Sequence, residues 1–301
     1  MTTSARRRRR DADARLGSLM LAPALIYIAA VIGFPFLLGI WYSVTDATVG
    51  GSTLHFVGLA NFRSIIADPT FWTALRNAIV FTVVSQILVV VLGKILAMAL
   101  YRPFPGRWLL RLLILLPWVA LISLGAIGWL WIYDPIYSII TWSLHALHVI
   151  PAGDTPVWLG EPHLAMASVI VVDVWRLLPL ATVIILAGLT AIPQDIHDAA
   201  LVDGAGFFRR LFAIQLPLVM PVMLIALLFG IVFTFTDMIV IYVLTRGGPF
   251  DSTQVIASYA YFTGVDGGDL ASGAAISLFL FPVLAAVALF FLTAARRAEV
   301  A

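Results

Sequence analysis

Cysteine is absent from the 301-residue sequence, and charged residues make up only 11% of it. Without cysteine the chain can form no disulfide, no thiolate metal site and no thiol nucleophile. A G-x-x-x-x-G-K-[ST] phosphate loop is also missing, so we expect the chain neither to bind nor to hydrolyse ATP, and to bind no cofactor of its own. No set of side chains has a catalytic spacing, and the sequence therefore does not predict an enzyme.

Apolar residues make up 62% of the chain, and the mean hydropathy is +1.04. Such a composition lies well outside that of soluble domains and predicts a multi-pass membrane protein. Six apolar segments are long enough to cross about 30 Å of hydrocarbon as helices. They cover roughly residues 16–44, 71–101, 108–133, 163–192, 218–244 and 270–295. We expect an all-α bundle of six spans, forming one transmembrane domain over residues 16–301 after a polar basic tail over residues 1–15.

The positions of Lys and Arg predict the orientation of this bundle, because both residues favour the cytoplasmic side of short loops. With the N-terminus inside, thirteen of the 18 Lys and Arg residues are cytoplasmic, and only Arg63, Arg76 and Arg246 lie outside. Both termini and the loop between the fourth and fifth spans are then cytoplasmic. Because the basic residues follow the loops and do not gather on one face, we expect no nucleic-acid partner.

The segment of residues 195–217 is the longest polar-bearing stretch with a helical pattern of its own. Ile196, Ala199 and Ala200 recur at i, i+3 and i+4, which predicts a short helix with a small apolar docking face. Gly204 follows this pattern, where a left-handed residue would end the helix. We expect a second short helix after it, with phenylalanines on one side and Arg209 and Arg210 on the other, and the next span from Pro217.

Ionisable residues inside spans are few, and each is costly unless it faces a cavity or a partner. Asp173 and Arg176 share a helix face near the middle of the fourth span, and Asp237 lies in the outer half of the fifth. Two interpretations stay open: these residues line a polar path for a solute, or they form a salt bridge that only fixes packing. Aromatic residues that could lie against a sugar in such a path are Trp129, Trp131, Trp175 and Tyr242.

Two other polar features carry no predicted function. Lys94 lies two turns before the cytoplasmic end of its span, so we expect its amine to reach the membrane surface. His145 and His148 have an i, i+3 spacing, but no third ligand stands at a suitable distance in the sequence. We predict no metal site.

One motif within residues 195–217, the segment that we expect to form a helical hairpin, resembles that of a known family. Asp198-Ala199-Ala200, three residues, Gly204, nine residues and then Ile214-x-Leu216-Pro217 resembles the E-A-A-x3-G-x9-I-x-L-P motif of the membrane subunits of bacterial binding-protein-dependent ABC importers. Asp198 replaces the usual Glu. In that family the motif forms coupling helices that dock on the ATPase subunit. The resemblance implies that contact for Asp198, Ala199, Ala200, Asp203, Gly204, Ile214, Leu216 and Pro217.

Further similarities favour the carbohydrate class of these permeases. Gly58-Leu59-x-Asn61-Phe62 and Tyr242-Val243-Leu244-Thr245-x-Gly247-Gly248-Pro249 are similar to elements of the first permease subunit of maltose, trehalose and glycerol-3-phosphate importers. Arg246 stands where a third glycine is common. Tyr137-Ser138-x2-Thr141 replaces the usual Tyr-Gly-x2-Asn.

The resemblance implies a permease subunit in a bacterial inner membrane that imports a sugar or related small solute. It also implies a second homologous permease subunit, two ATPases that bind ATP and Mg²⁺, an extracytoplasmic solute-binding protein, and membrane lipid around the bundle. Alternatives are an importer permease for a non-sugar solute and an ion-coupled secondary transporter, which would need carboxylates at the midplane for Na⁺ or H⁺. A non-transporting scaffold would not explain the polar residues in the fourth span.

Overall fold

The computed structural model describes residues 20–151 and 153–300, and within those ranges every named element is a helix. The only extended pairing there is an isolated antiparallel bridge between Thr45 and Phe56. The predicted all-α fold is therefore confirmed. The predicted basic tail, residues 1–15, lies outside the described residues.

Five helices are long and apolar enough to cross a membrane, and a bent helix pair makes a sixth span if it is counted as one. The five are Met20–Ser43, which contains η1 (Ala29–Gly33) and α2 (Phe34–Ser43); α4 (Pro69–Tyr101); α8 (Pro162–Thr190); Phe207–Phe235; and Leu270–Phe291, which begins with α14 (Leu270–Leu278) and runs into α15 (Leu280–Val300). The positions of four of them match the predicted segments, and the helix Phe207–Phe235 is shifted relative to its predicted segment, residues 218–244.

The predicted third span is not one straight helix. It consists of α5 (Arg107–Val119) and α6 (Ile122–Ile132), which are bent by 96° relative to each other. Between these two helices, Ala120 and Leu121 have extended backbone dihedrals. Pro117 lies one turn before the bend, and its missing N–H weakens the end of α5.

The fifth span differs from the prediction at both ends. The expected second short helix does not exist separately, because α10 (Phe207–Arg209), π-helical η2 (Arg210–Gln215) and α11 (Leu216–Phe235) form one continuous helix. Pro217 lies inside this helix and does not begin the span. At the other end the helix stops at Phe235, and α12 (Ile239–Leu244) starts after a break.

The central helix of the bundle is α8, which packs against α4, α5 and α11. One core cluster joins Phe81 and Val89 of α4 to Val169 and Leu177 of α8. A second cluster, nearer the hairpin, joins Leu100 to Ile185 and Val219. Glycine allows the close approach at this end, since a Cβ on Gly188 would lie 2.9 Å from Val219 Cγ1.

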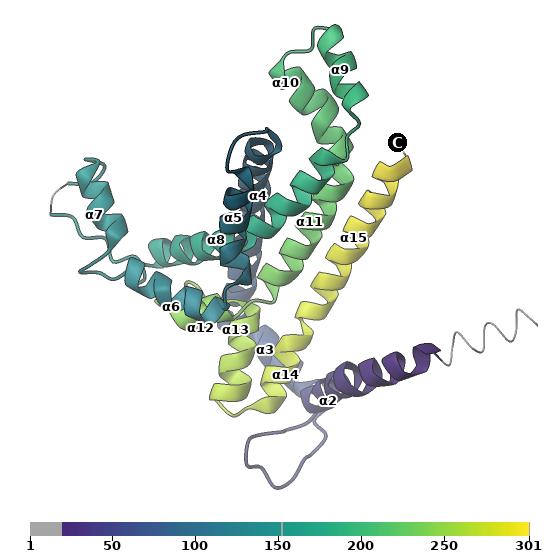
Figure 1. The fold of residues 1–301 in the computed structure, drawn as a ribbon. Coiled ribbons are helices and arrows are strands. Elements are labelled where there is room, and N and C mark those ends of the chain that lie inside the picture. The colour runs from purple at the N-terminus through teal and green to yellow at the C-terminus, as the bar shows by residue number, and fades with distance from the viewer. Residues whose placement is uncertain (1–19, 152, 301) are drawn as a thin grey trace, which may run out of the picture.

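The elements α3 (Ala60–Ala67), α13 (Ile256–Tyr261), η3 (Phe262–Asp266) and α14 close the end of the bundle opposite the hairpin (Figure 1). Asp68 caps α4 by accepting a hydrogen bond from Thr70 N–H at 2.8 Å, and it also accepts one from the Tyr259 hydroxyl. The bond from Tyr259 lowers the pKa of the Asp68 carboxyl. The contact ties the start of α4 to α13.

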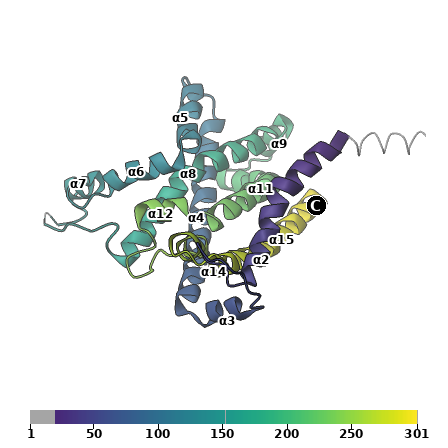
Figure 2. The ribbon, with the colours of Figure 1, turned by 90° about the horizontal axis from the view of Figure 1, so that it is seen from below.

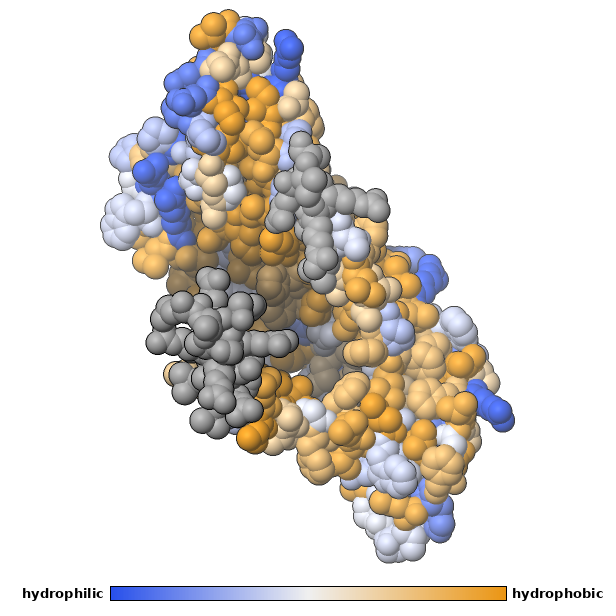
Figure 3. All heavy atoms as spheres, turned by 90° about the vertical axis from the view of Figure 1, so that its right-hand side faces the viewer, coloured by the Kyte–Doolittle hydropathy of each residue, from blue (hydrophilic) through white to orange (hydrophobic). Residues whose placement is uncertain are grey.

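Several helices leave this bundle. Figures 1 and 2 show α6 and α7 (Ile139–Ala146) extending from one side and α2 from the other, while α9 (Gln194–Val202) extends beyond the end of α11. Hydrophobic residues cover much of the face drawn in Figure 3, and hydrophilic residues gather toward its two ends. This distribution is the one expected of a protein whose middle lies in lipid.

A close contact between the backbones of α14 and η3 predicts a specific loss of stability. A Cβ on Gly273 of α14 would lie 2.4 Å from Gly264 Cα and 2.9 Å from the Ala260 carbonyl oxygen, and backbone atoms cannot rotate away. We expect Gly273→Ala to lower the free energy of unfolding by about 1–3 kcal/mol, as overpacking does. The measurement is SDS-induced unfolding in mixed micelles. Gly128→Ala is the matched control, because nothing lies within 4 Å of its Cβ. Equal unfolding midpoints for both variants would contradict this packing.

Candidate functional site

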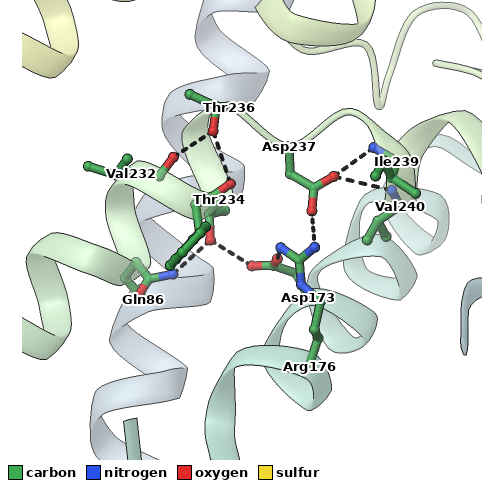
Figure 4. Close-up of polar contacts among 10 residues, drawn as sticks. Gln86, Asp173, Arg176, Val232, Thr234, Thr236, Asp237, Ile239 and Val240 are labelled. Carbon is green, nitrogen blue, oxygen red and sulfur yellow. Dashed lines mark hydrogen bonds and ion pairs between the residues drawn. The ribbon is translucent and has the colours of Figure 1, made fainter. Parts of the chain in front are cut away.

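Three charged side chains meet in the interior of the bundle (Figure 4). Arg176 Nη2 lies 3.1 Å from Asp173 Oδ1 on the preceding turn of α8, and Arg176 Nη1 contacts Asp237 Oδ2 in the break before α12. Asp173 is fully buried, and the Arg176 side chain is 14% exposed. We call Asp173, Arg176 and Asp237 the ion network.

The break after α11 explains the position of Asp237. The sequence predicted it inside the fifth span, but it lies between two helices, and Asp237 Oδ1 accepts hydrogen bonds from the N–H groups of Ile239 at 2.6 Å and Val240 at 3.4 Å. These amides open α12, where no helical carbonyl precedes them. Asp237 therefore caps α12 with one oxygen and pairs with Arg176 through the other.

Two neutral residues that the sequence analysis did not single out extend the network to α4. Thr234 Oγ1 donates to Asp173 Oδ2 at 2.9 Å and accepts from Gln86 Nε2 at 2.8 Å. A Cβ on Gly230 would collide with Gln86 Oε1, so glycine provides the room for this amide. The available signal was a polar residue in the middle of an apolar span, which indicates a buried polar contact even where the residue is not ionisable.

The charged groups of the ion network are bonded to one another. Each carboxylate has Arg176 as counter-ion and a further donor, so neither is a free acceptor in this conformation. The geometry therefore matches the packing interpretation, in which the charges fix α8 against α11 and α12. Buried polar atoms without a partner among the described residues remain beside it: Thr82 Oγ1, Ser85 Oγ and Arg176 Nε.

The aromatic candidates do not form one surface. Trp175 and Trp129 pack edge to face with ring centroids 5.8 Å apart, close to the network helix, whereas Trp131 is 76% exposed. Tyr242 packs against Tyr261 in a separate cluster. Arg246 lies 5.1 Å above the Tyr242 ring and pairs with Asp266, a cation–π contact that the sequence analysis did not predict.

The position of Lys94 contradicts the prediction that its amine reaches the membrane surface. Its side chain is 8% exposed, and Nζ has no hydrogen-bond partner among the described residues. The amine is enclosed within the bundle and does not reach the surface. Of the two histidines, His145 Nε2 lies 2.8 Å from the Asp154 carbonyl oxygen. In the described part of the chain no three His, Cys, Asp or Glu side chains group together in a way that could hold a metal.

The hairpin begins with α9, and the C-terminal end of this helix has the predicted glycine geometry. Gly204 has φ +69°, and the N–H groups of Gly204 and Ala205 donate to the carbonyls of Leu201 and Ala200 at 3.0 and 2.9 Å. This pair of bonds is the Schellman arrangement, which requires a left-handed residue at the position of Gly204. Asp203, the residue before it, is exposed.

The three residues of the predicted docking face of α9, Ile196, Ala199 and Ala200, do not all face the same way. Ala200 is 6% exposed and Ile196 packs against the second core cluster, so both face this chain's own bundle. The small size of Ala200 is thereby explained within the chain. Ala199 and Asp198 face outward, and the Asp198 carboxylate accepts a hydrogen bond from Gln194 at 3.0 Å. Val202, at the end of α9, is 88% exposed.

The later residues of the motif lie in the continuous helix. Ile214 falls in η2, and Leu216 and Pro217 begin α11. Leu216 packs against the second core cluster. These three positions join the hairpin to the span, and the exposed tip is formed by apolar side chains that the motif does not include: Leu201, Val202, Phe207, Phe208 and Phe212.

Known proteins resemble this chain along nearly its whole length. It is 34% identical over 284 residues to a trehalose/maltose transport system permease protein, MalF, of Thermococcus litoralis, covering 94% of this chain and 95% of the relative. It is 30% identical to the sulfoquinovosyl glycerol permease SmoG of Agrobacterium fabrum (94% and 91% covered) and 30% identical to the trehalose permease SugA of Mycobacterium tuberculosis (94% and 89%).

The fold is also that of a solved transporter. A chain in the crystal structure of a bacterial alginate ABC transporter, in complex with an alginate pentasaccharide-bound periplasmic protein, superposes with a TM-score of 0.81. The two chains share 19% identity, and 96% of each is covered. Residues 89–298, more than half of the chain, match the family model described as binding-protein-dependent transport system inner membrane component. The chain belongs to this family of inner-membrane ABC transporter permeases.

Proposed function

We propose that this permease imports a sugar or a related small polyhydroxylated solute as one half of a translocation path. The second half is a homologous permease subunit, two ATPases bind ATP and Mg²⁺, and an extracytoplasmic protein delivers the solute. Support for the sugar comes from the relatives, whose names specify trehalose, maltose and sulfoquinovosyl glycerol. We expect ATP to be bound and hydrolysed by the partner ATPases and not by this chain.

The observation that carries the coupling role is the position of the hairpin tip. Figure 1 places α9 beyond the end of α11, and the exposed side chains there include Val202, Phe208 and Phe212. A rigid apolar tip that extends beyond the spans fits a cleft on another protein. The last helix, α15, ends on the same side of the bundle (Figure 1), which supports a cytoplasmic C-terminus beside a cytoplasmic hairpin.

Coupling to the other side of the membrane would run along one helix. Phe207–Phe235 begins at the hairpin and ends at the break that holds Asp237. At about 1.5 Å per residue this helix is roughly 43 Å long, enough to cross the bilayer. Movement of the tip with the ATPases would shift the break, and alternating access follows if one state keeps the ion network and the other opens it.

In this account Asp173, Arg176 and Asp237 act as a gate, and a solute need not bind them. Trp175, Trp129 and Tyr242 flank the helices that would separate, and Trp131 faces outward. An ion-coupled secondary transporter is the weaker candidate, because both carboxylates are already paired with Arg176.

Gly204 tests the coupling role. A Cβ with φ near +69° costs about 1 kcal/mol or more, although open space surrounds the position. We expect Gly204→Val to abolish uptake and Gly204→Ala to reduce it, because the tip would be presented at a wrong angle. Gly206→Val is the matched control, since Gly206 is two residues away, has φ −65° and has nothing within 4 Å of its Cβ. Uptake and co-purification of the ATPase are measured together. Normal uptake by Gly204→Val with the ATPase bound would refute the proposal.

Asp237 tests the gate. Asp237→Asn keeps an oxygen that can accept from Ile239 and Val240 but removes the charge that pairs with Arg176, so we expect assembled complex with uptake lowered at least about tenfold. Asp237→Ala also removes the cap of α12 and should reduce the yield of complex. The measurements are initial uptake rate and complex yield. Asp266→Asn, which breaks an exposed pair, should leave both near wild type. Wild-type uptake by Asp237→Asn would exclude the gate.

A further inference from the structure

A polar cavity lies where α4, α8 and the hairpin meet. Its volume is about 270 Å³, and it is lined by the last residue of α4, Tyr101, by Arg102 after it, and by His197 of α9. Tyr101 and His197 share a hydrogen bond of 3.4 Å between the hydroxyl and Nε2. Arg210 and Gln215 also line it. The lining is thus rich in hydrogen-bond donors, two of them guanidinium groups.

The π-helical stretch is what brings Arg210 and Gln215 together. Residues five apart lie more than a third of a turn away from each other on an α-helix, but they fall close to one face where bonds run from i+5 to i. In η2 this pattern is present, with Leu216 N–H donating to Leu211 O. Arg210 and Gln215 are the first and last residues of the stretch, and both reach the same cavity. The π-helical stretch therefore places Arg210 and Gln215 at the same cavity.

The two arginines of the cavity have no carboxylate partner in the described part of the chain. Neither Arg102 nor Arg210 forms an ion pair there. The nearby carboxylate of Asp198 does not line the cavity and is bonded to Gln194. The cavity thus concentrates positive charge.

The position of the cavity indicates where its ligand comes from. Tyr101 ends a membrane span, so the cavity lies at the level where hydrocarbon gives way to water. Apolar side chains of Met98, Leu201 and Phe207 complete its wall. Basic cavities between helices on the cytoplasmic side of a membrane suit anionic head groups, with arginine forming paired bonds to phosphate oxygens.

We propose that this cavity binds a phosphate-bearing anion, which in the membrane is the head group of an anionic phospholipid. Arg102 and Arg210 would hold the phosphate oxygens, while His197, Tyr101 and Gln215 would donate further bonds. An acyl chain would follow Met98 and the end of α4. Because Arg210 belongs to the helix that leaves the hairpin, occupancy would fix the hairpin relative to α4. The site goes beyond the proposed transport function and does not depend on ATPase docking.

The test uses the purified complex in nanodiscs of phosphatidylcholine with increasing phosphatidylglycerol, followed by native mass spectrometry of the lipids retained. We expect Arg102→Ala and Arg210→Ala each to weaken retention of phosphatidylglycerol by about tenfold, the loss expected for a charge-assisted hydrogen bond, and Arg210→Lys to restore part of it. Arg209→Ala is the matched control. It removes the same charge from the neighbouring position but lines no part of the cavity.

A second arm adds inorganic phosphate to complexes in phosphatidylcholine alone and follows the thermal unfolding midpoint. A shift that requires Arg102 and Arg210 would support the anion site and assign a free anion as a source, whereas retention of phosphatidylglycerol without a phosphate shift assigns the lipid. The proposal is overturned if both alanine variants respond to lipid and phosphate as wild type does, or if Arg209→Ala weakens binding equally. Co-purification of the ATPase is scored separately, so failure of this site is distinguishable from failure of the coupling role.

Discussion

Two carboxylates and one guanidinium are buried together where α8, the end of α11 and α12 meet, and each of these charges would be costly to bury there without the others. The pairing allows the chain to break a helix inside the bundle. Asp237 satisfies the first amides of α12, and Arg176 neutralises Asp237 while remaining tied to Asp173. Loss of Arg176 would leave both carboxylates as unpaired charges in a medium that does not solvate them.

The same constraint governs the remainder of the fold. In lipid every backbone group needs a partner, so irregular backbone occurs only where side chains or neighbouring helices supply one. At the break after α11 the partner is a carboxylate. Outside the spans, at the hairpin, a glycine turn satisfies the last carbonyls of α9. In η2 the partner comes from a change of hydrogen-bond register, which lets Pro217 sit within a continuous helix. The helix Phe207–Phe235 thus has irregular backbone next to each end and regular helix in between.

The sequence predicts the spans well because hydropathy over about 20 residues is a strong signal, and it predicts Gly204 because only a few residues tolerate its backbone conformation. The sequence does not predict the features that long-range packing determines. The bend between α5 and α6, the break at Asp237 and the continuity of Arg209 with Leu216 depend on neighbours that no local pattern specifies. Lys94 was placed at the surface from its distance to the end of the span, but the fold encloses it.

The candidate site shows the same limit. Asp173 and Arg176 could be paired from their spacing of three. However, Thr234, which donates to Asp173, lies 61 positions away from it, and Gln86, which donates to Thr234, lies 148 positions away from Thr234. Ala200 was assigned to a partner contact because it is small, and it is buried against its own bundle. A motif specifies residue types, and the packing decides which of them face outward.

The most direct test of the central claim, that the tip of α9 meets the ATPase, uses the absence of cysteine. A single cysteine is introduced at Val202, 88% exposed on the hairpin, or at Phe250, 93% exposed in the loop after α12 at the other end of the bundle. Each variant complex is treated with a short bifunctional thiol reagent, using an ATPase that carries one cysteine in its docking cleft. The account predicts that Val202→Cys cross-links to the ATPase and Phe250→Cys does not. Cross-linking from Phe250→Cys, with none from Val202→Cys in an assembled complex, would contradict it.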